Sequence, residues 1–321
     1  MKPVIAITVG DMNGIGPEVV LKAISARATQ AVCQPLLVGP WQVFRHYAKV
    51  LRIDIPPLFV SEPDGPLTAG IKPGKVSTAA GRIADGAIRR GVELVLGGFA
   101  DALVTAPVSK TAMRMGGNRF PGQTEFLQRL TRSRRVAMML VAGTFRVGLV
   151  TIHVPLSKVA SLLTRARATE TIRVVYDALV SDWGIRHPRL AVLGLNPHAG
   201  EDGQIGSDER RVLLPVIKRF DTEGLAIEDP FPADSFFARG LHKKYDAVIA
   251  MYHDQGLIPL KMSAGGRGVN VTAGLPIVRT SPDHGTGFDI AGKGIADAGS
   301  MIEAITTAVD LSRRRKRNRK R

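Results

Sequence analysis

Three apolar segments of the chain each lead into a histidine. They begin at residues 147, 190 and 247 and reach His153, His198 and His253. Each segment has the length and the β-branched content of a buried parallel strand, which places its histidine near the carboxyl end of that strand. Open α/β sheets bind ligands at that edge, and three imidazoles there can hold a divalent metal with positions left for a substrate. We therefore predict that His153, His198 and His253 are metal ligands.

The residues beside these histidines support a metal site. Glu201 follows His198 closely and Asp254 follows His253 directly. Carboxylates beside ligating imidazoles fix the tautomer and raise the basicity of the ring. Because no cysteine lies nearby, the expected metal is Zn, Mg, Co, Mn or Ni, and we favour Zn. A single histidine at a strand end usually makes a structural hydrogen bond, but three of the seven histidines share this setting.

A second set of residues suits an anion. Lys261, Asn270 and Arg279 are spaced nine residues apart across glycine-rich loops. Arg offers a planar fork, Lys a point charge and Asn a neutral donor, although ordinary surface cations would look the same in the sequence. Gln123 and Thr124 stand at the start of an expected helix, where free amides bind anions. Thr124 is also the expected N-cap, and simple capping is the alternative there.

The charge of the chain is uneven. The formal net charge of +16 falls to +8 once the eight Lys and Arg of residues 313–321 are subtracted. We expect this tail to be a disordered, solvated extension, with nucleic-acid binding as the less favoured alternative. The remaining +8 suits an enzyme that attracts anionic small molecules.

Length and composition narrow the class of protein. A chain of 321 residues is long enough for two lobes, and its single cysteine, Cys33, fits a reducing compartment. No apolar run approaches the roughly 20 residues of a membrane span. The chain enters an expected strand at Lys2, so we expect no signal peptide. These features predict a cytoplasmic protein with no membrane partner.

Expected strands and helices alternate along the chain. The strands are predicted at 2–9, 34–38, 102–105, 136–141, 145–152, 190–195, 225–228 and 246–251, and the main helices at 18–25, 41–50, 81–96, 109–115, 124–132, 157–182, 208–222, 234–240 and 295–312. This pattern indicates an α/β fold with a mostly parallel sheet and one antiparallel hairpin, 136–152. The glycine-rich loops 10–17 and 283–292 match neither the dinucleotide fingerprint nor a Walker A sequence, so a nucleotide must be held differently.

Several longer motifs occur together in one order. They are GDMNGIGPE at 10–18, TAPVSK at 105–110, GQTE at 122–125, HVPL at 153–156, NPHAGE at 196–201, PADSF at 232–236, YHDQG at 252–256, GVNVTAGLP at 268–276 and RTSPDHGT at 279–286. In these motifs, over residues 10 to 290, the chain resembles the 4-hydroxythreonine-4-phosphate dehydrogenase family of pyridoxal phosphate biosynthesis.

The resemblance implies an architecture. It is a two-lobed α/β/α fold like those of isocitrate and isopropylmalate dehydrogenases, with the active site in the cleft between the lobes. Residues 1–125 and 265–321 would form the first lobe, and residues 126–264 the second lobe with the metal histidines and the dimer interface. The protein would be a homodimer whose site is completed across that interface.

The resemblance also implies an activity. The enzyme would be an NAD(P)-dependent, oxidatively decarboxylating dehydrogenase with one divalent metal per site. It would oxidise 4-phosphohydroxy-L-threonine to a β-keto acid that decarboxylates to 3-amino-2-oxopropyl phosphate. The metal would lower the pKa of the substrate hydroxyl and later stabilise the enolate.

Roles for individual residues follow from the same resemblance. The metal would be held by His153, His198 and His253. The phosphorylated four-carbon hydroxy acid would be bound by Gln123, Thr124, Lys261, Asn270 and Arg279. The candidate catalytic residues are Asp254, Asp234 and Lys261, and the candidate contacts of NAD or NADP are Asn196, Gly285, Thr286 and Asp289.

Two departures from the family pattern bear on the substrate. Gln123 stands where the family usually has histidine, and Met12 replaces the usual proline. Because glutamine can donate a hydrogen bond but cannot carry charge, 4-phospho-D-threonate or 4-phospho-D-erythronate remain alternative substrates. A non-catalytic binding protein is the other alternative, but the complete set of three histidines argues against it.

Overall fold

The computed structural model describes residues 2–55, 59–62 and 70–318. It is an α/β protein, as predicted, and it divides into two compact units. Unit 1 comprises residues 1–134 and 275–316, and unit 2 comprises residues 135–274 and 317–321. The divisions lie later in the chain than the lobe boundaries predicted at 125 and 265.

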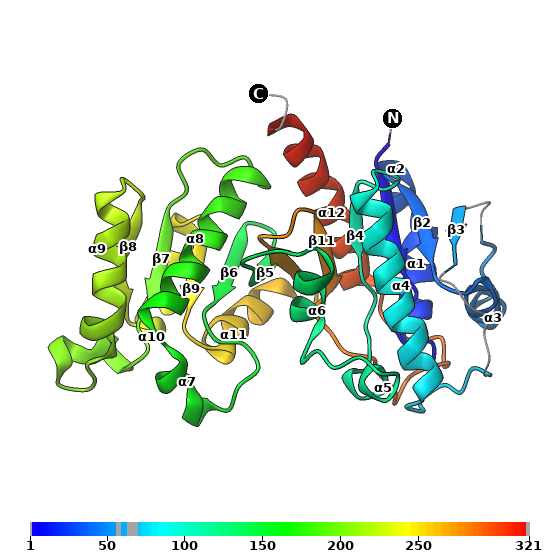
Figure 1. Ribbon diagram of the computed structural model, residues 1–321, viewed down its shortest axis with the longest axis horizontal. Helices are drawn as coiled ribbons and strands as arrows, with labels where there is room; N and C mark the ends of the chain where they lie inside the picture. Colours follow the sequence, from blue (N-terminus) through cyan, green and yellow to red (C-terminus); the bar gives the residue numbers. More distant parts are fainter. Residues whose placement is uncertain (1, 56–58, 63–69, 319–321) are drawn as a thin grey trace. The chain divides into compact units, whose positions relative to one another are not determined.

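Unit 1 is built on a parallel sheet whose strands follow the order β3-β2-β1-β4-β11. The strands are β1 (Val4–Thr8), β2 (Gln34–Val38), β3 (Phe59–Ser61), β4 (Ala102–Val104) and β11 (Arg279–Pro282). The helices are α1 (Gly16–Ser25), α2 (Arg27–Val32), α3 (Trp41–Leu51), α4 (Thr78–Leu96), α5 (Lys110–Met115), α6 (Gln123–Leu130) and α12 (Gly299–Asn318). Helix α4 packs along β1 and β4 (Figure 1).

Unit 2 contains strands in the order β10-β5-β6-β9-β7-β8. They are β5 (Ala137–Ala142), β6 (Phe145–Leu149), β7 (Leu190–Leu193), β8 (Ile227–Phe231), β9 (Ala247–Ala250) and β10 (Val269–Ala273). The helical segments are α7 (Leu156–Leu162), α8 (Arg165–Ser181), η1 (Pro197–Gly203), η2 (Glu209–Leu213), α9 (Leu214–Thr222), α10 (Ala233–Ala238), η3 (Leu241–Lys244) and α11 (His253–Ala264). Strands β5 and β6 form the predicted antiparallel hairpin.

The three strands that precede the histidines lie next to one another. Strand β9 pairs in parallel with β6 on one side and with β7 on the other. Their carboxyl ends therefore meet at one edge of the sheet, which confirms the arrangement predicted from the sequence. All three strands are buried except for half-buried Arg146 in β6, in keeping with their apolar composition.

Two glycines allow helices to approach this sheet closely on opposite faces. A Cβ at Gly148 of β6 would lie 2.6 Å from a methyl group of Val175 in α8. A Cβ at Gly256 of α11 would lie 2.4 Å from a methyl group of Val147, the neighbouring residue of β6. Because successive strand residues face opposite sides of a sheet, α8 and α11 cover opposite faces.

Some predicted elements need correction. The helical region 157–182 is two helices, because Thr164 has extended backbone and its hydroxyl accepts a hydrogen bond from the Arg167 N–H to cap α8. Helix α11 was not predicted, since Gly256 and Pro259 interrupt its helical pattern. It contains Lys261, while Asn270 lies in β10 and Arg279 begins β11, so none of the three lies in a loop.

The basic tail also differs from the prediction. Helix α12 continues to Asn318 instead of ending at residue 312. The Arg313 and Arg315 side chains donate hydrogen bonds to backbone carbonyls, and Lys316 pairs with Asp101, so these cations have partners that stabilise helix. Residues 319–321 lie outside the described part. No helix within the described part is long and apolar enough to cross a membrane.

Candidate active site

His153 and His253 come together in unit 2. Their ring centroids are 5.5 Å apart, and the rings lie beyond the carboxyl ends of β6 and β9. The His253 Nδ1 atom lies 2.7 Å from the Asp254 Oδ1 atom. This contact fixes the ring and leaves Nε2 available to coordinate a metal, which is the arrangement that carboxylates give ligating imidazoles. The pair therefore fits a divalent metal.

His198 occupies an unusual backbone conformation. It begins a run of six residues, 198–203, with positive φ, four of them not glycine. Within one chain, the described residues form no group of three or more His, Cys, Asp or Glu side chains that could hold a metal ion. The structure thus brings together two of the three predicted ligands, and the role of His198 stays a prediction.

Two buried or half-buried side chains tie the strand ends together. The Thr151 hydroxyl donates to the Met251 carbonyl at 2.7 Å, which joins the segment before His153 to the end of β9. The Gln255 amide accepts from the Met251 N–H at 2.7 Å and donates to the Gly194 carbonyl at 2.6 Å. Sequence reasoning missed both residues, although each is a polar residue two positions from a predicted ligand.

The predicted substrate residues of unit 1 also meet. Arg279 is 1% exposed, and its Nη2 atom donates to the Gln123 Oε1 atom at 2.8 Å and to the Thr105 Oγ1 atom at 2.6 Å. Burial lowers the pKa of Arg279 to about 9, so the guanidinium stays charged at neutral pH. Because the oxygen of Gln123 contacts this buried cation, the amide NH₂ of Gln123 points away from it and is a donor.

The start of helix α6 differs from the prediction in one respect. Gly122 is the N-cap residue with extended backbone, and the helix begins at Gln123. Thr124 is therefore in the first turn and is buried, so it does not cap the helix.

The remaining predicted residues are distributed over unit 2. Lys261 is exposed in the last turn of α11, and Asp234 is exposed in the first turn of α10. Asn270 is half-buried in β10, and its Oδ1 atom is buried with no hydrogen-bond partner among the described residues. An acceptor left in this state fits a ligand that carries a donor.

The two glycine-rich loops of unit 1 contact each other. The Ile15 N–H donates to the Thr286 carbonyl at 2.8 Å, and a Cβ at Gly14 would lie 2.8 Å from the same oxygen. Gly285 and Asp289 are exposed in the second loop. In the first loop Asp11 is buried, which raises the pKa of its carboxyl. The buried first loop therefore supports the second loop from below, and the contacts of Asn196, Gly285, Thr286 and Asp289 with a nicotinamide cofactor stay predictions.

Comparison with known proteins identifies the family. The family model of the pyridoxal phosphate biosynthetic protein PdxA matches residues 31–308. The chain is 41% identical over 324 residues to the 4-hydroxythreonine-4-phosphate dehydrogenase of Desulforapulum autotrophicum, covering 96% of this chain and 95% of that protein. The chain belongs to the PdxA family. The predicted resemblance is thereby confirmed.

Further relatives show the range of the PdxA family. The D-threonate 4-phosphate dehydrogenase of Cupriavidus necator is 39% identical, with 98% of each chain covered. The crystal structure of 4-hydroxythreonine-4-phosphate dehydrogenase from Klebsiella pneumoniae has a TM-score of 0.87 and 37% identity, covering 97% of this chain and 98% of that one. Isocitrate dehydrogenase from Methylococcus capsulatus, at 16% identity and a TM-score of 0.50 with 99% of this chain and 89% of that one covered, shares the fold. The predicted fold class is confirmed.

Proposed function

We propose that the protein is an oxidoreductase that oxidises 4-phosphohydroxy-L-threonine with NAD or NADP. The product is a β-keto acid that loses carbon dioxide to give 3-amino-2-oxopropyl phosphate. The observation that carries this proposal is the His153–His253 pair with Asp254, at the carboxyl ends of neighbouring parallel strands. The names of the relatives support the same activity.

Separate residues would bind the metal, orient its ligands and accept the substrate proton. His153, His198 and His253 would hold the divalent metal, which when bound lowers the pKa of the substrate hydroxyl and polarises the ketone. Asp254 is engaged by His253 and therefore orients that ligand. Asp234 is then the candidate group that accepts the hydroxyl proton.

Charge and hydrogen bonding would hold the substrate. Arg279 supplies a permanent positive charge at neutral pH, and Gln123 presents a neutral donor beside it. Lys261 would add a second cation, and the Asn270 Oδ1 atom a buried acceptor. The two cations suit a phosphorylated acid, which carries negative charge at both ends, and the Asn270 oxygen suits a donor of the same molecule.

We further propose that the protein works as a homodimer that completes the site. Ile258 and Met262 stand one turn apart on α11, the helix that begins at His253, and are 59% and 82% exposed. Contiguous exposed apolar patches mark protein interfaces, and this pair is the candidate for such a patch on α11. Met262→Asp should convert a dimer into monomers in light scattering, whereas Ser263→Asp on the same helix should not. A wild-type protein that is monomeric at tens of micromolar would contradict the proposal.

The activity is tested by nicotinamide reduction with metal-reconstituted protein. Three substrates should be compared: 4-phosphohydroxy-L-threonine, 4-phospho-D-threonate and 4-phospho-D-erythronate. Preference for the first supports the proposal, and preference for either of the others assigns the protein to sugar-acid catabolism. The Cupriavidus relative is named for D-threonate 4-phosphate, which is why the second substrate is included.

The metal is tested separately by His253→Ala. The variant should lose turnover by at least about 100-fold, because one of three ligands and the Asp254 contact are removed. Its circular dichroism and oligomeric state should match those of the wild type. Full activity of the variant after chelator treatment would end the metal proposal.

A further inference from the structure

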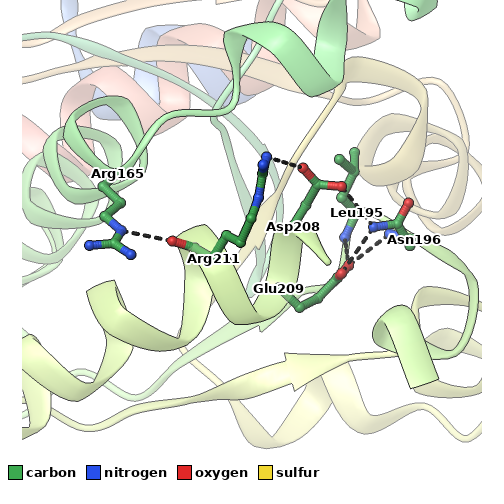
Figure 2. Close-up of polar contacts among 6 residues, drawn as sticks. All are labelled: Arg165, Leu195, Asn196, Asp208, Glu209 and Arg211. Atoms are coloured by element: carbon green, nitrogen blue, oxygen red, sulfur yellow. Dashed lines mark hydrogen bonds and ion pairs between the residues drawn. The ribbon is translucent and has the colours of Figure 1, made fainter. Parts of the chain in front are cut away.

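Glu209 is a buried acid to which no role has been assigned above. Its side chain lies at the start of η2 and is 3% exposed. The Oε1 atom accepts hydrogen bonds from the backbone N–H groups of Leu195 and Asn196, both at 2.8 Å. The Oε2 atom accepts from the Asn196 Nδ2 atom at 2.9 Å (Figure 2). One carboxylate therefore holds the chain just before His198 by three hydrogen bonds.

The segment that follows needs such an anchor. Residues 198–202 of this run have left-handed backbone, which L residues other than glycine disfavour, and four of these five residues are not glycine. The turn fits closely over the acid, since a Cβ at Gly200 would lie 2.6 Å from the Glu209 Oε2 atom. The conformation that carries His198 is therefore fitted to the carboxylate of Glu209.

Further hydrogen bonds connect Asn196, the partner of Glu209, to Asp208 and Arg211 near the start of η2. Asn196 Nδ2 also donates to Asp208 Oδ2 at 3.2 Å, and Asp208 Oδ1 lies 3.4 Å from Arg211 Nη2 (Figure 2). Both hydrogens of the Asn196 amide are thus used inside unit 2. Asn196 therefore helps to support the turn, and this role is independent of the predicted cofactor contact.

We propose that Glu209 is a positioning residue that holds the left-handed turn 198–202 in the conformation that presents His198. The link to metal binding rests on the proposed function, in which His198 is a ligand. The link to the turn rests only on the contacts of Glu209.

The first test is Glu209→Gln, measured by hydrogen exchange of the intact protein and by Zn²⁺ titration against a chromogenic chelator. Glutamine keeps one oxygen for the two backbone N–H groups but turns an NH₂ toward the NH₂ of Asn196. Amides of residues 195–206 should exchange at least about ten-fold faster, and the Zn²⁺ dissociation constant should rise about 10- to 100-fold. Glu170→Gln, the same change at an exposed position of α8, should alter neither.

A second variant breaks the same contact from the other side. Gly200→Ala places a methyl group against the Glu209 Oε2 atom and should reproduce both effects. Unchanged exchange at 195–206 in folded Glu209→Gln protein would overturn the proposal. Where His198→Ala weakens Zn²⁺ binding, a lower melting temperature of Glu209→Gln with unchanged Zn²⁺ affinity would also overturn it, because that result marks a purely structural acid.

The two proposals can fail separately. If His198→Ala binds Zn²⁺ as tightly as the wild type, His198 is not a metal ligand, and that part of the proposed function is wrong. The exchange rates of Glu209→Gln still decide, in that case, whether Glu209 holds the turn.

Discussion

Gln123 is the residue that most affects which acid the enzyme prefers. Its oxygen accepts a hydrogen bond from buried Arg279, so its NH₂ points away from that cation. We expect Gln123→His to raise kcat/KM for 4-phosphohydroxy-L-threonine by about 3- to 10-fold, since an imidazole offers a more rigid donor than a glutamine side chain. Initial rates with each phosphorylated acid measure the change. Gln128→His on the same helix is the matched control.

The same variant has a pH signature. The Arg279 charge favours the neutral form of an imidazole at position 123, which places the pKa of that ring below its ordinary value of about 6.5. The gain in kcat/KM should therefore be complete above about pH 7 and fall as pH drops through the lowered pKa. Unchanged or poorer kinetics at every pH would instead mark Gln123 as an adaptation to another substrate.

Helix α11 sets the position of His253, and its contact with β6 can be tested. Gly256→Ala adds a methyl group 2.4 Å from Val147 and 3.0 Å from the Cβ of Ala250, two buried residues of β6 and β9 that cannot move aside easily. Overpacking costs about 1–3 kcal/mol, and the better helix propensity of alanine returns up to about 1 kcal/mol. We expect a net loss of about 1–2 kcal/mol in the free energy of unfolding.

Urea denaturation measures this loss. Gly285→Ala is a suitable control, because a Cβ there meets nothing within 4 Å. Equal stability of the Gly256 variant and the wild type would show that α11 does not depend on this close approach.

The elements differ in how far the sequence predicts them. Strands β6, β7 and β9 are continuous apolar runs, so their type and their shared edge could be predicted. Helix α11 could not, since Gly256 and Pro259 obscure its pattern. The left-handed turn at His198 was also missed, because the acid that holds it stands more than ten residues later in the chain.

The residues of the candidate site also differ in how far the sequence predicts them. Residue types predicted the two histidines that meet, and the motifs named Arg279 and Gln123 as candidate residues, but not the hydrogen bond between them. The supporting contacts of Thr151, Gln255 and Glu209 depend on which backbone groups the fold brings near, and no residue type encodes that.

At the scale of the whole molecule, the basic end of α12 is the feature whose role changed most. Arg313 and Arg315 donate to the carbonyls of Val32 and Leu275 at 3.1 and 3.2 Å, and Lys316 pairs with Asp101. Exposed contacts of this kind contribute up to about 1 kcal/mol each. A protein truncated after Ser312 should therefore lose about 1–2 kcal/mol of stability, seen as a lower melting temperature.

Turnover per folded molecule should not change in that truncation, because no predicted site residue lies in α12. Truncation after Asn318 is the control and should leave the melting temperature unchanged, since it spares all three contacts.

Measurement of duplex-DNA binding tests the remaining alternative, which is that the basic segment binds nucleic acid. A protein that neutralises several phosphates through this segment would show an affinity that falls steeply with salt and a slope that disappears on truncation. Because Arg313, Arg315 and Lys316 already have partners within unit 1, we expect weak binding whose salt dependence is the same in both truncations.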